Sequence, residues 1–149
     1  MVRFFQINES VFYHGCNNYL DVGIVLTPRL DDYEQEWNGT DFYNVLEKYR
    51  PDNMLAHKQS VFMVADPDEV DLAGGGSEWL FTLSPLGKIQ RHDMNWSSEI
   101  SWLVGDGYSI ESDEVISTAN NYWLGKPHHD ENLWEYLTTH AKIVKVEKY

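Results

Sequence analysis

The apolar residues of this chain come in short runs interrupted by turn-forming residues, and this pattern limits the folds open to it. Six of these runs have the composition or alternation typical of strands. We therefore predict strands at residues 10–14, 22–26, 60–65, 79–83, 100–104 and 141–147. Pro28, Pro67 and the sequence Ser84-Pro85-Leu86-Gly87 follow three of them, as expected of residues that interrupt a strand.

Three further segments repeat their apolar residues at helical spacing. They predict helices at residues 41–49, 113–124 and 131–139. The first is followed by Pro51, and the second by Gly125, a residue that commonly ends a helix. Strands and helices do not alternate regularly along the chain, so the sequence predicts an α+β fold rather than a parallel α/β sheet.

The size of the chain favours one compact unit. It has 149 residues, of which 14% are aromatic. One domain usually takes about 100–200 residues, and disordered chains are poor in aromatic residues. We therefore expect residues 1–149 to form a single globular domain.

The charge balance excludes several partners. The chain has 11 Lys and Arg residues and 24 Asp and Glu residues, which gives a net charge of −13. Such a chain lacks the basic surface expected of a protein that binds nucleic acid or an anionic membrane. No apolar run approaches the roughly 20 residues of a membrane span, and Arg3 and Glu9 interrupt any signal-peptide core. With a single cysteine, Cys16, these features predict a cytoplasmic protein.

One stretch near the N-terminus carries a more specific signal. Phe12-Tyr13-His14-Gly15-Cys16, with the spaced residues that follow it up to Leu26, resembles the first motif of the ADP-ribosyltransferase fold. More narrowly, it resembles the rifamycin-type (rifampin) ADP-ribosyltransferases. Three later stretches, residues 61–65, 80–95 and 134–147, keep the family's order and look like its second strand, its carboxylate-bearing loop and its terminal helix-to-strand segment.

The resemblance implies two short, mostly antiparallel β-sheets around an NAD cleft, with peripheral helices. It also implies an NAD-dependent mono-ADP-ribosyltransferase that moves ADP-ribose to a small-molecule hydroxyl or a protein. NAD would be a substrate, and no metal is required. Breaking the bond between nicotinamide and ribose develops positive charge on the sugar, which a nearby carboxylate stabilises.

The resemblance also implies roles for the residues of this chain that match the family's motifs. Tyr13, His14, Gly15 and Phe62 would bind NAD, and His14, Phe62 and Asp93 would form the catalytic set. His14 would hold a ribose hydroxyl, Gly15 the nicotinamide amide, and Phe62 the nicotinamide ring. Cys16 and Phe62 replace the threonine and tyrosine usual in the family. Phenylalanine keeps the stacking face and loses the hydroxyl.

Other interpretations stay open. His14 could be a structural histidine and Asp93 a solvated loop residue. The chain could be a catalytically silent member of the fold that binds a nucleotide or a protein, or an acidic decoy of nucleic-acid-binding proteins. The run His128-His129-Asp130-Glu131 has metal-binding residue types, but adjacent histidines on a strand or coil are expected to point apart, so we predict no metal.

Overall fold

The computed structural model describes residues 11–28, 40–73, 76–129 and 132–149. It has a mixed α+β fold with two antiparallel sheets, which confirms the predicted α+β class. The ADP-ribosyltransferase fold stays a prediction. The chain divides into two compact units, and each takes more than one segment of the sequence. The first unit uses residues 1–28, 60–89 and 136–149, and the second uses residues 29–59 and 90–135. The expectation of a single domain stays a prediction.

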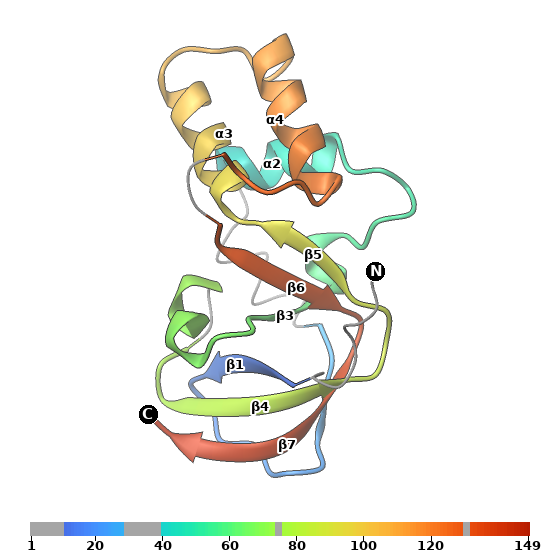
Figure 1. Cartoon of the computed structure of the whole chain (residues 1–149), viewed down its shortest axis with the longest axis vertical. Coiled ribbons are helices and arrows are strands. Elements are labelled where there is room, and N and C mark those ends of the chain that lie inside the picture. The colour runs from blue at the N-terminus through green and yellow to red at the C-terminus, as the bar shows by residue number, and fades with distance from the viewer. Residues whose placement is uncertain (1–10, 29–39, 74–75, 130–131) are drawn as a thin grey trace. The chain divides into compact units, whose positions relative to one another are not determined.

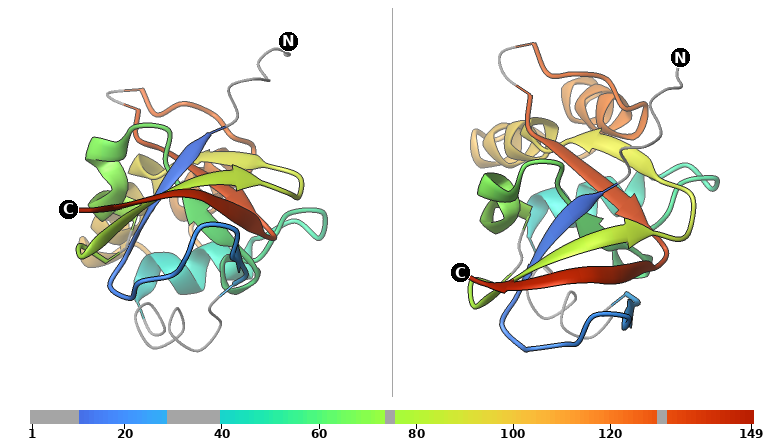
Figure 2. Two further views of the ribbon diagram at one scale, coloured as in Figure 1. Left: turned by 90° about the horizontal axis from the view of Figure 1, so that it is seen from below. Right: turned by 60° about the horizontal axis from the view of Figure 1, so that its bottom comes forward.

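The first unit contains a four-stranded sheet with the order β1-β4-β7-β2 (Figure 1). Its strands are β1 (Phe12–Cys16), β2 (Val25–Leu26), β4 (Trp79–Pro85) and β7 (Ala141–Lys148). All three pairings are antiparallel, and the right-hand view of Figure 2 shows β1, β4 and β7 next to one another. The predicted strands at residues 79–83 and 141–147 are confirmed, whereas the one at 22–26 shortens to its last two residues. Residue 10, the first of the predicted strand at 10–14, lies outside the described residues.

Period-two alternation builds the core of this unit. Phe81 and Leu83 on β4, and Ala141 and Ile143 on β7, are fully buried, whereas Lys142 between the last two is exposed. The buried cluster consists of Cys16, Leu26, Val61, Met63, Phe81, Leu83, Ala141 and Ile143. Cys16 is thus a buried core residue.

A second sheet has the order β3-β6-β5. Its strands are β3 (Val61–Met63), β5 (Gln90–Asp93) and β6 (Trp134–Thr138). The last three residues of β6 pair antiparallel with β3 within the first unit. Tyr13 of β1 forms an isolated antiparallel bridge with Val64, the residue after β3.

The second unit is mainly helical. Its helices are α2 (Asp41–Lys48), α3 (Asn95–Gly105) and α4 (Asp113–Trp123), together with a short 3-10 helix, η1 (His57–Gln59). Their inner faces form one cluster of Val45, Leu46, Trp96, Ile100, Leu103, Val115, Ala119, Tyr122 and Trp123. The predicted helices at residues 41–49 and 113–124 are confirmed. Another 3-10 segment, η2 (Pro67–Ala73), belongs to the first unit.

Two predicted elements are wrong. Residues 100–104, predicted as a strand, lie in α3, where Trp96, Ile100 and Leu103 are buried at helical spacing and Trp102 is 64% exposed. Within residues 131–139, predicted as a helix, Trp134–Thr138 form β6. Consequently, residues 134–147 form two strands rather than a helix and a strand. Residue 131 lies outside the described residues.

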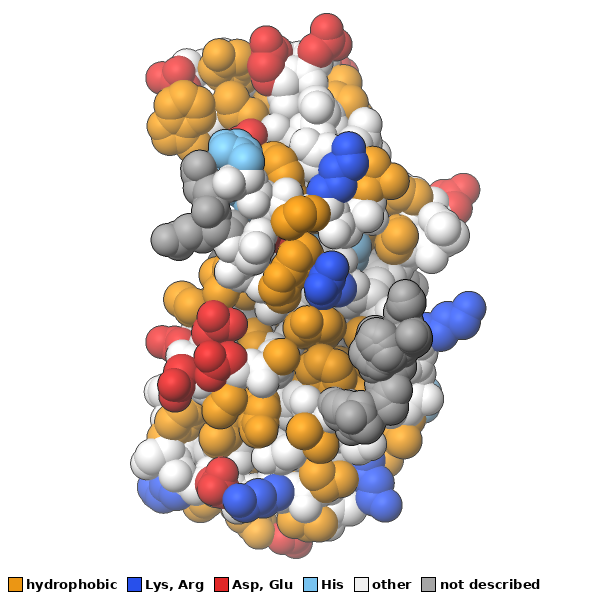
Figure 3. Space-filling view, viewed as in Figure 1, with side chains coloured by type: hydrophobic (Ala, Val, Ile, Leu, Met, Phe, Trp, Pro, Cys, Tyr) orange, Lys and Arg blue, Asp and Glu red, His pale blue; other side chains and the backbone are white. Residues whose placement is uncertain are grey.

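The described helices are all too short, or insufficiently apolar, to cross a bilayer. On the face displayed in Figure 3, acidic side chains lie at several separate places and apolar side chains lie among them.

Candidate functional site

His14 is placed on β1 by pairing opposite Phe81 of β4. Its Nδ1 lies 2.8 Å from the main-chain oxygen of Phe62 on β3. Because a carbonyl oxygen can only accept, Nδ1 carries the proton and donates. In the neutral ring, Nε2 is then the nitrogen with acceptor character. This contact fixes the orientation of the imidazole, and the side chain is half-buried.

Phe62 and Tyr13 flank this histidine within the first unit. Tyr13 exchanges two main-chain hydrogen bonds with Val64, at 2.8 and 3.0 Å. Phe62 lies between Val61 and Met63 on β3, and its residue is 8% exposed. The structure therefore brings Tyr13, His14 and Phe62 together, and it leaves little of Phe62 open to solvent.

Gly15 allows a close approach of main chain to main chain. A Cβ atom added at Gly15 would lie 2.2 Å from the carbonyl oxygen of Gly76. The amide of Gly76 also donates to the Gly15 carbonyl at 3.0 Å. Glycine is therefore required here to seat the segment at residue 76 against β1.

Asp93 ends β5 in the second unit and is fully buried. Its Oδ1 accepts from the amides of Asn95, at 3.0 Å, and Leu133, at 3.1 Å. Its Oδ2 accepts from the amide of His128, at 2.9 Å, and from Nδ2 of Asn132, at 3.0 Å. Burial raises the pKa of this carboxyl, but the four hydrogen bonds outweigh it and leave the pKa below its usual value.

This geometry gives Asp93 a structural task. The carboxylate joins the start of α3 to the segment that leads into β6. It is an ionised group, as the chemistry of ADP-ribosyl transfer requires, but four donors already surround it. His14, Gly15 and Phe62 belong to the first unit and Asp93 to the second. The assignment of Asp93 to their site stays a prediction.

A buried polar network, which the sequence did not reveal, surrounds Tyr122 of α4. The Tyr122 hydroxyl donates to Oε2 of Glu135 on β6 in a short hydrogen bond, and it lies 2.7 Å from Nε2 of His57. Since the hydroxyl has one proton, Nε2 of His57 donates to it. His92 stacks on the Tyr122 ring at 4.4 Å and lies 2.6 Å from the Tyr122 carbonyl.

Burial controls protonation in this network. Removal from water lowers the pKa of His57 to about 3, with the neighbouring His92 and Arg50 acting in the same direction. It lowers the pKa of His92 to about 4, against the raising effect of the Tyr122 carbonyl. It raises the pKa of Glu135 to about 7, although the hydrogen bond from Tyr122 opposes the shift and Asp93 reinforces it.

Glu135 could have been found from the sequence only if residues 134–138 had been assigned to a strand. On a strand, Glu135 and Leu137 share one face, so a carboxylate falls at a core position. The predicted helix at residues 131–139 did not indicate that Glu135 is a core residue.

Glu99, His128 and His129 form the candidate metal ligands in the described part of the chain. The rings of the two histidines stack with centroids 4.3 Å apart. Adjacent histidines were expected to point apart, and that expectation is wrong, since the two ring planes lie only 23° from parallel.

No protein-family model matches this chain, and neither does any curated protein.

Proposed function

We propose that this chain is an NAD-dependent mono-ADP-ribosyltransferase of the rifamycin-type fold family, acting on a small-molecule hydroxyl or a protein acceptor. The observation that supports the proposal best is the His14 imidazole, held by the Phe62 carbonyl at 2.8 Å. In this tautomer, Nε2 has the acceptor character that a ribose hydroxyl requires. The two antiparallel sheets are consistent with the fold that the resemblance implies.

The chemistry assigns each residue a task. His14 would orient the ribose, the main chain at Gly15 would hold the nicotinamide amide, and Tyr13 and Phe62 would supply aromatic surface. Nicotinamide leaves as a neutral molecule, so departure needs little help from an acid. The positive charge that develops on the ribose ring needs an ionised carboxylate, for which Asp93 is the candidate.

The charge state favours Asp93 over Glu135 for this role. Hydrogen bonds keep the pKa of Asp93 low, so its carboxylate is ionised at neutral pH. Burial raises the pKa of Glu135 to about 7, so a large share of that group is protonated there. A neutral acid stabilises a cation poorly.

The test is release of nicotinamide from NAD by the full chain, with and without candidate acceptors. We expect release by the wild type and a loss of about 100-fold or more in His14→Ala, because misplacing a substrate by about 1 Å can cost a factor of that order. The matched control is His140→Ala, a half-buried histidine elsewhere in the first unit. Equal release by the wild type and His14→Ala would contradict the proposal.

A second candidate function has its own supporting observation. The Asp93 carboxylate is fully buried and already accepts four hydrogen bonds, which favours a chain that binds NAD or another nucleotide without turning it over. Calorimetry with NAD separates the two candidates. Binding that His14→Ala weakens, without release of nicotinamide with any acceptor, supports the silent member.

A further inference from the structure

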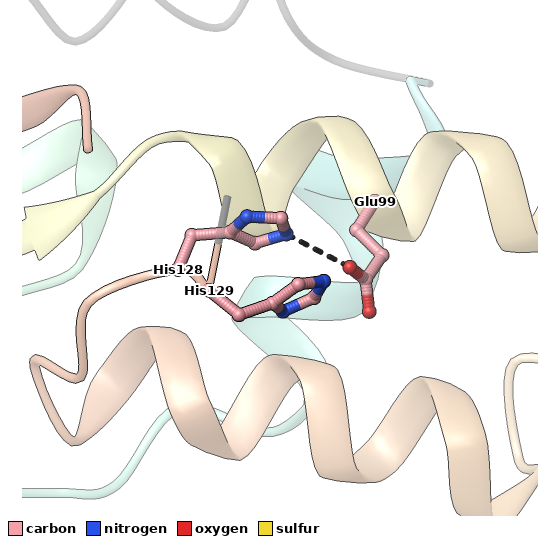
Figure 4. Close-up of side chains that lie close together, drawn as sticks. All are labelled: Glu99, His128 and His129. Carbon is pink, nitrogen blue, oxygen red and sulfur yellow. Dashed lines mark hydrogen bonds and ion pairs between the residues drawn. The ribbon is translucent and has the colours of Figure 1, made fainter. Parts of the chain in front are cut away.

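Three potential metal ligands meet in the second unit. Glu99 lies in the middle of α3, and His128 and His129 lie in the segment that follows α4. One oxygen or nitrogen atom from each side chain lies within 4.8 Å of the other two. Figure 4 shows a ring nitrogen of each histidine directed toward the Glu99 carboxylate.

The surrounding chain holds the carboxylate in place. Oε1 of Glu99 lies 2.9 Å from Nε2 of His128. Oε2 lies 3.2 Å from the Thr118 hydroxyl of α4, which shares its proton with the Glu114 carbonyl at 2.8 Å. Outer contacts of this kind orient the ligands of metal sites.

The histidine segment is also anchored. The main-chain amide of His128 donates to Asp93 at 2.9 Å. The Trp96 ring packs edge-on against His128 at 4.6 Å and His129 at 6.2 Å, and its Nε1 donates to the Lys126 carbonyl at 2.8 Å. The ligand segment is therefore tied to β5 and to α3 before any ion binds.

We propose that Glu99, His128 and His129 bind a divalent transition metal ion, with Zn²⁺ as the best match. Two imidazoles and one carboxylate are a common protein donor set for zinc, and water can complete a tetrahedron. Ligand distances of about 2.0–2.2 Å place neighbouring ligand atoms about 3.4 Å apart. The Glu99–His128 pair is already that close, and side-chain rotation brings in His129. Mg²⁺ and Ca²⁺ prefer oxygen donors and suit this set poorly.

The site is separate from the proposed transferase chemistry, which requires no metal. It would connect α3 to the segment that leads into β6. Metal binding should therefore stabilise the second unit, whether or not the chain acts on NAD.

The test uses the full chain, stripped with a chelator and titrated with Zn²⁺ against a chromophoric chelator. Because the net charge of −13 attracts cations weakly everywhere, the buffer contains salt at physiological strength and excess Mg²⁺ to occupy oxygen-only sites. We expect one Zn²⁺ per chain. We also expect Co²⁺ to give the visible absorption of a site with nitrogen ligands, and Zn²⁺ to raise the melting temperature.

Glu99→Gln, His128→Ala and His129→Ala should each weaken Zn²⁺ binding by more than about 100-fold, since even outer partners of a metal site contribute about 10–100-fold. Glu114→Gln, an exposed residue of α4, and His140→Ala are the matched controls and should bind as the wild type does. His129 is exposed, so its replacement removes only its ring contacts with His128 and Trp96 and leaves the buried core of the second unit unchanged.

The proposal is overturned if the wild type binds no stoichiometric Zn²⁺ under these conditions, which would leave His128 and Glu99 as an ion pair alone. It is equally overturned if His129→Ala and Glu99→Gln, folded by circular dichroism, bind Zn²⁺ as tightly as the wild type. If the wild type binds one Zn²⁺ but releases no nicotinamide from NAD, the transferase proposal fails and the metal site stands.

Discussion

Asp93 shows how one side chain can serve the fold in a position where the sequence suggests chemistry. Its two oxygens accept four hydrogen bonds, three of them from main-chain amides. A charged acceptor in this setting stabilises the fold more than a neutral one. The catalytic and structural interpretations predict different results for the same substitution.

Asp93→Asn should lower the free energy of unfolding by at least about 2 kcal/mol. The NH₂ group of the asparagine would face N–H groups that now donate to the carboxylate, so buried donors would lose their acceptor. Urea denaturation measures this. Asp52→Asn, at an exposed position of the same unit, should change stability by less than about 0.5 kcal/mol. If Asp93→Asn keeps the wild-type unfolding midpoint but loses nicotinamide release, the catalytic interpretation holds.

The buried network around Tyr122 links stability to pH. Between pH 4.5 and 6.5, His57 and His92 bind protons in the unfolded state but largely not in the folded state, since burial lowers their pKa to about 3 and about 4. Glu135 does the reverse, because burial raises its pKa from 4.5 to about 7. The unfolded chain therefore binds about one more proton from these three groups, so stability rises with pH in this window.

Glu135→Gln should make that rise steeper. Removing the opposing group changes the slope from about 1.4 to about 2.7 kcal/mol per pH unit at most, since each proton contributes about 1.4. Urea unfolding at several values between pH 5 and 6.5 measures the slope, and Glu114→Gln should leave it unchanged. An identical slope in Glu135→Gln and the wild type would show that Glu135 is already ionised in the folded state.

At the scale of elements, β1 depends on a glycine for its contact with a neighbouring segment. Gly15→Ala should destabilise the chain by about 1–3 kcal/mol, because the new Cβ would overlap the Gly76 carbonyl and the main chain must shift. Gly105→Ala, at the end of α3, is the opposite case: its Cβ meets nothing within 4 Å, and stability should rise by about 0.4–1 kcal/mol. Thermal unfolding should show a lower melting temperature for Gly15→Ala and a higher one for Gly105→Ala. An unchanged melting temperature in Gly15→Ala would contradict the close approach of Gly76 to Gly15.

The start of α4 depends on Ser112, whose hydroxyl oxygen accepts from the amide of Val115 at 3.3 Å. Ser112→Ala should lower stability by about 1 kcal/mol through loss of this cap. Ser98→Ala, on the exposed side of α3, should leave stability unchanged or raise it slightly, because alanine favours helix. A drop of equal size in both variants would mean that Ser112 does not cap the helix.

The misassigned elements have a common physical cause. In residues 100–104, a short apolar run before Gly105 suggested a strand, but the buried set begins at Trp96, outside that window, and its spacing is helical. In residues 131–139, Leu133, Trp134 and Leu137 fit a helix locally. Pairing of Phe62 opposite Leu137 makes this segment a strand, and that partner lies far away in the sequence.

At the scale of the whole molecule, the net charge of −13 makes the folded chain repel itself. Raising NaCl from 10 to 150 mM shortens the screening length from about 30 to about 8 Å, so the urea midpoint should increase. KCl should act like NaCl, since screening does not depend on the cation. A midpoint that falls with salt would show that attractive ion pairs outweigh the repulsion.

The same charge bears on the decoy interpretation. The acidic side chains visible in Figure 3 are spread over the displayed face rather than gathered in a stripe. A decoy would compete with DNA for a basic protein and lose that competition as salt rises.

What the sequence alone determined is the local part of the fold. Periods of 2 and 3.6 residues located β4, β7, α2 and α4, because each pattern reports which side of one element is buried. The tertiary structure decided what depends on distant partners: the strand at residues 134–138, the donors around Asp93, the buried network of Tyr122, and the approach of Glu99 to His128. Hydrogen bonds and pairings between residues tens of positions apart leave no periodic signal in the chain, so only the folded structure reveals them.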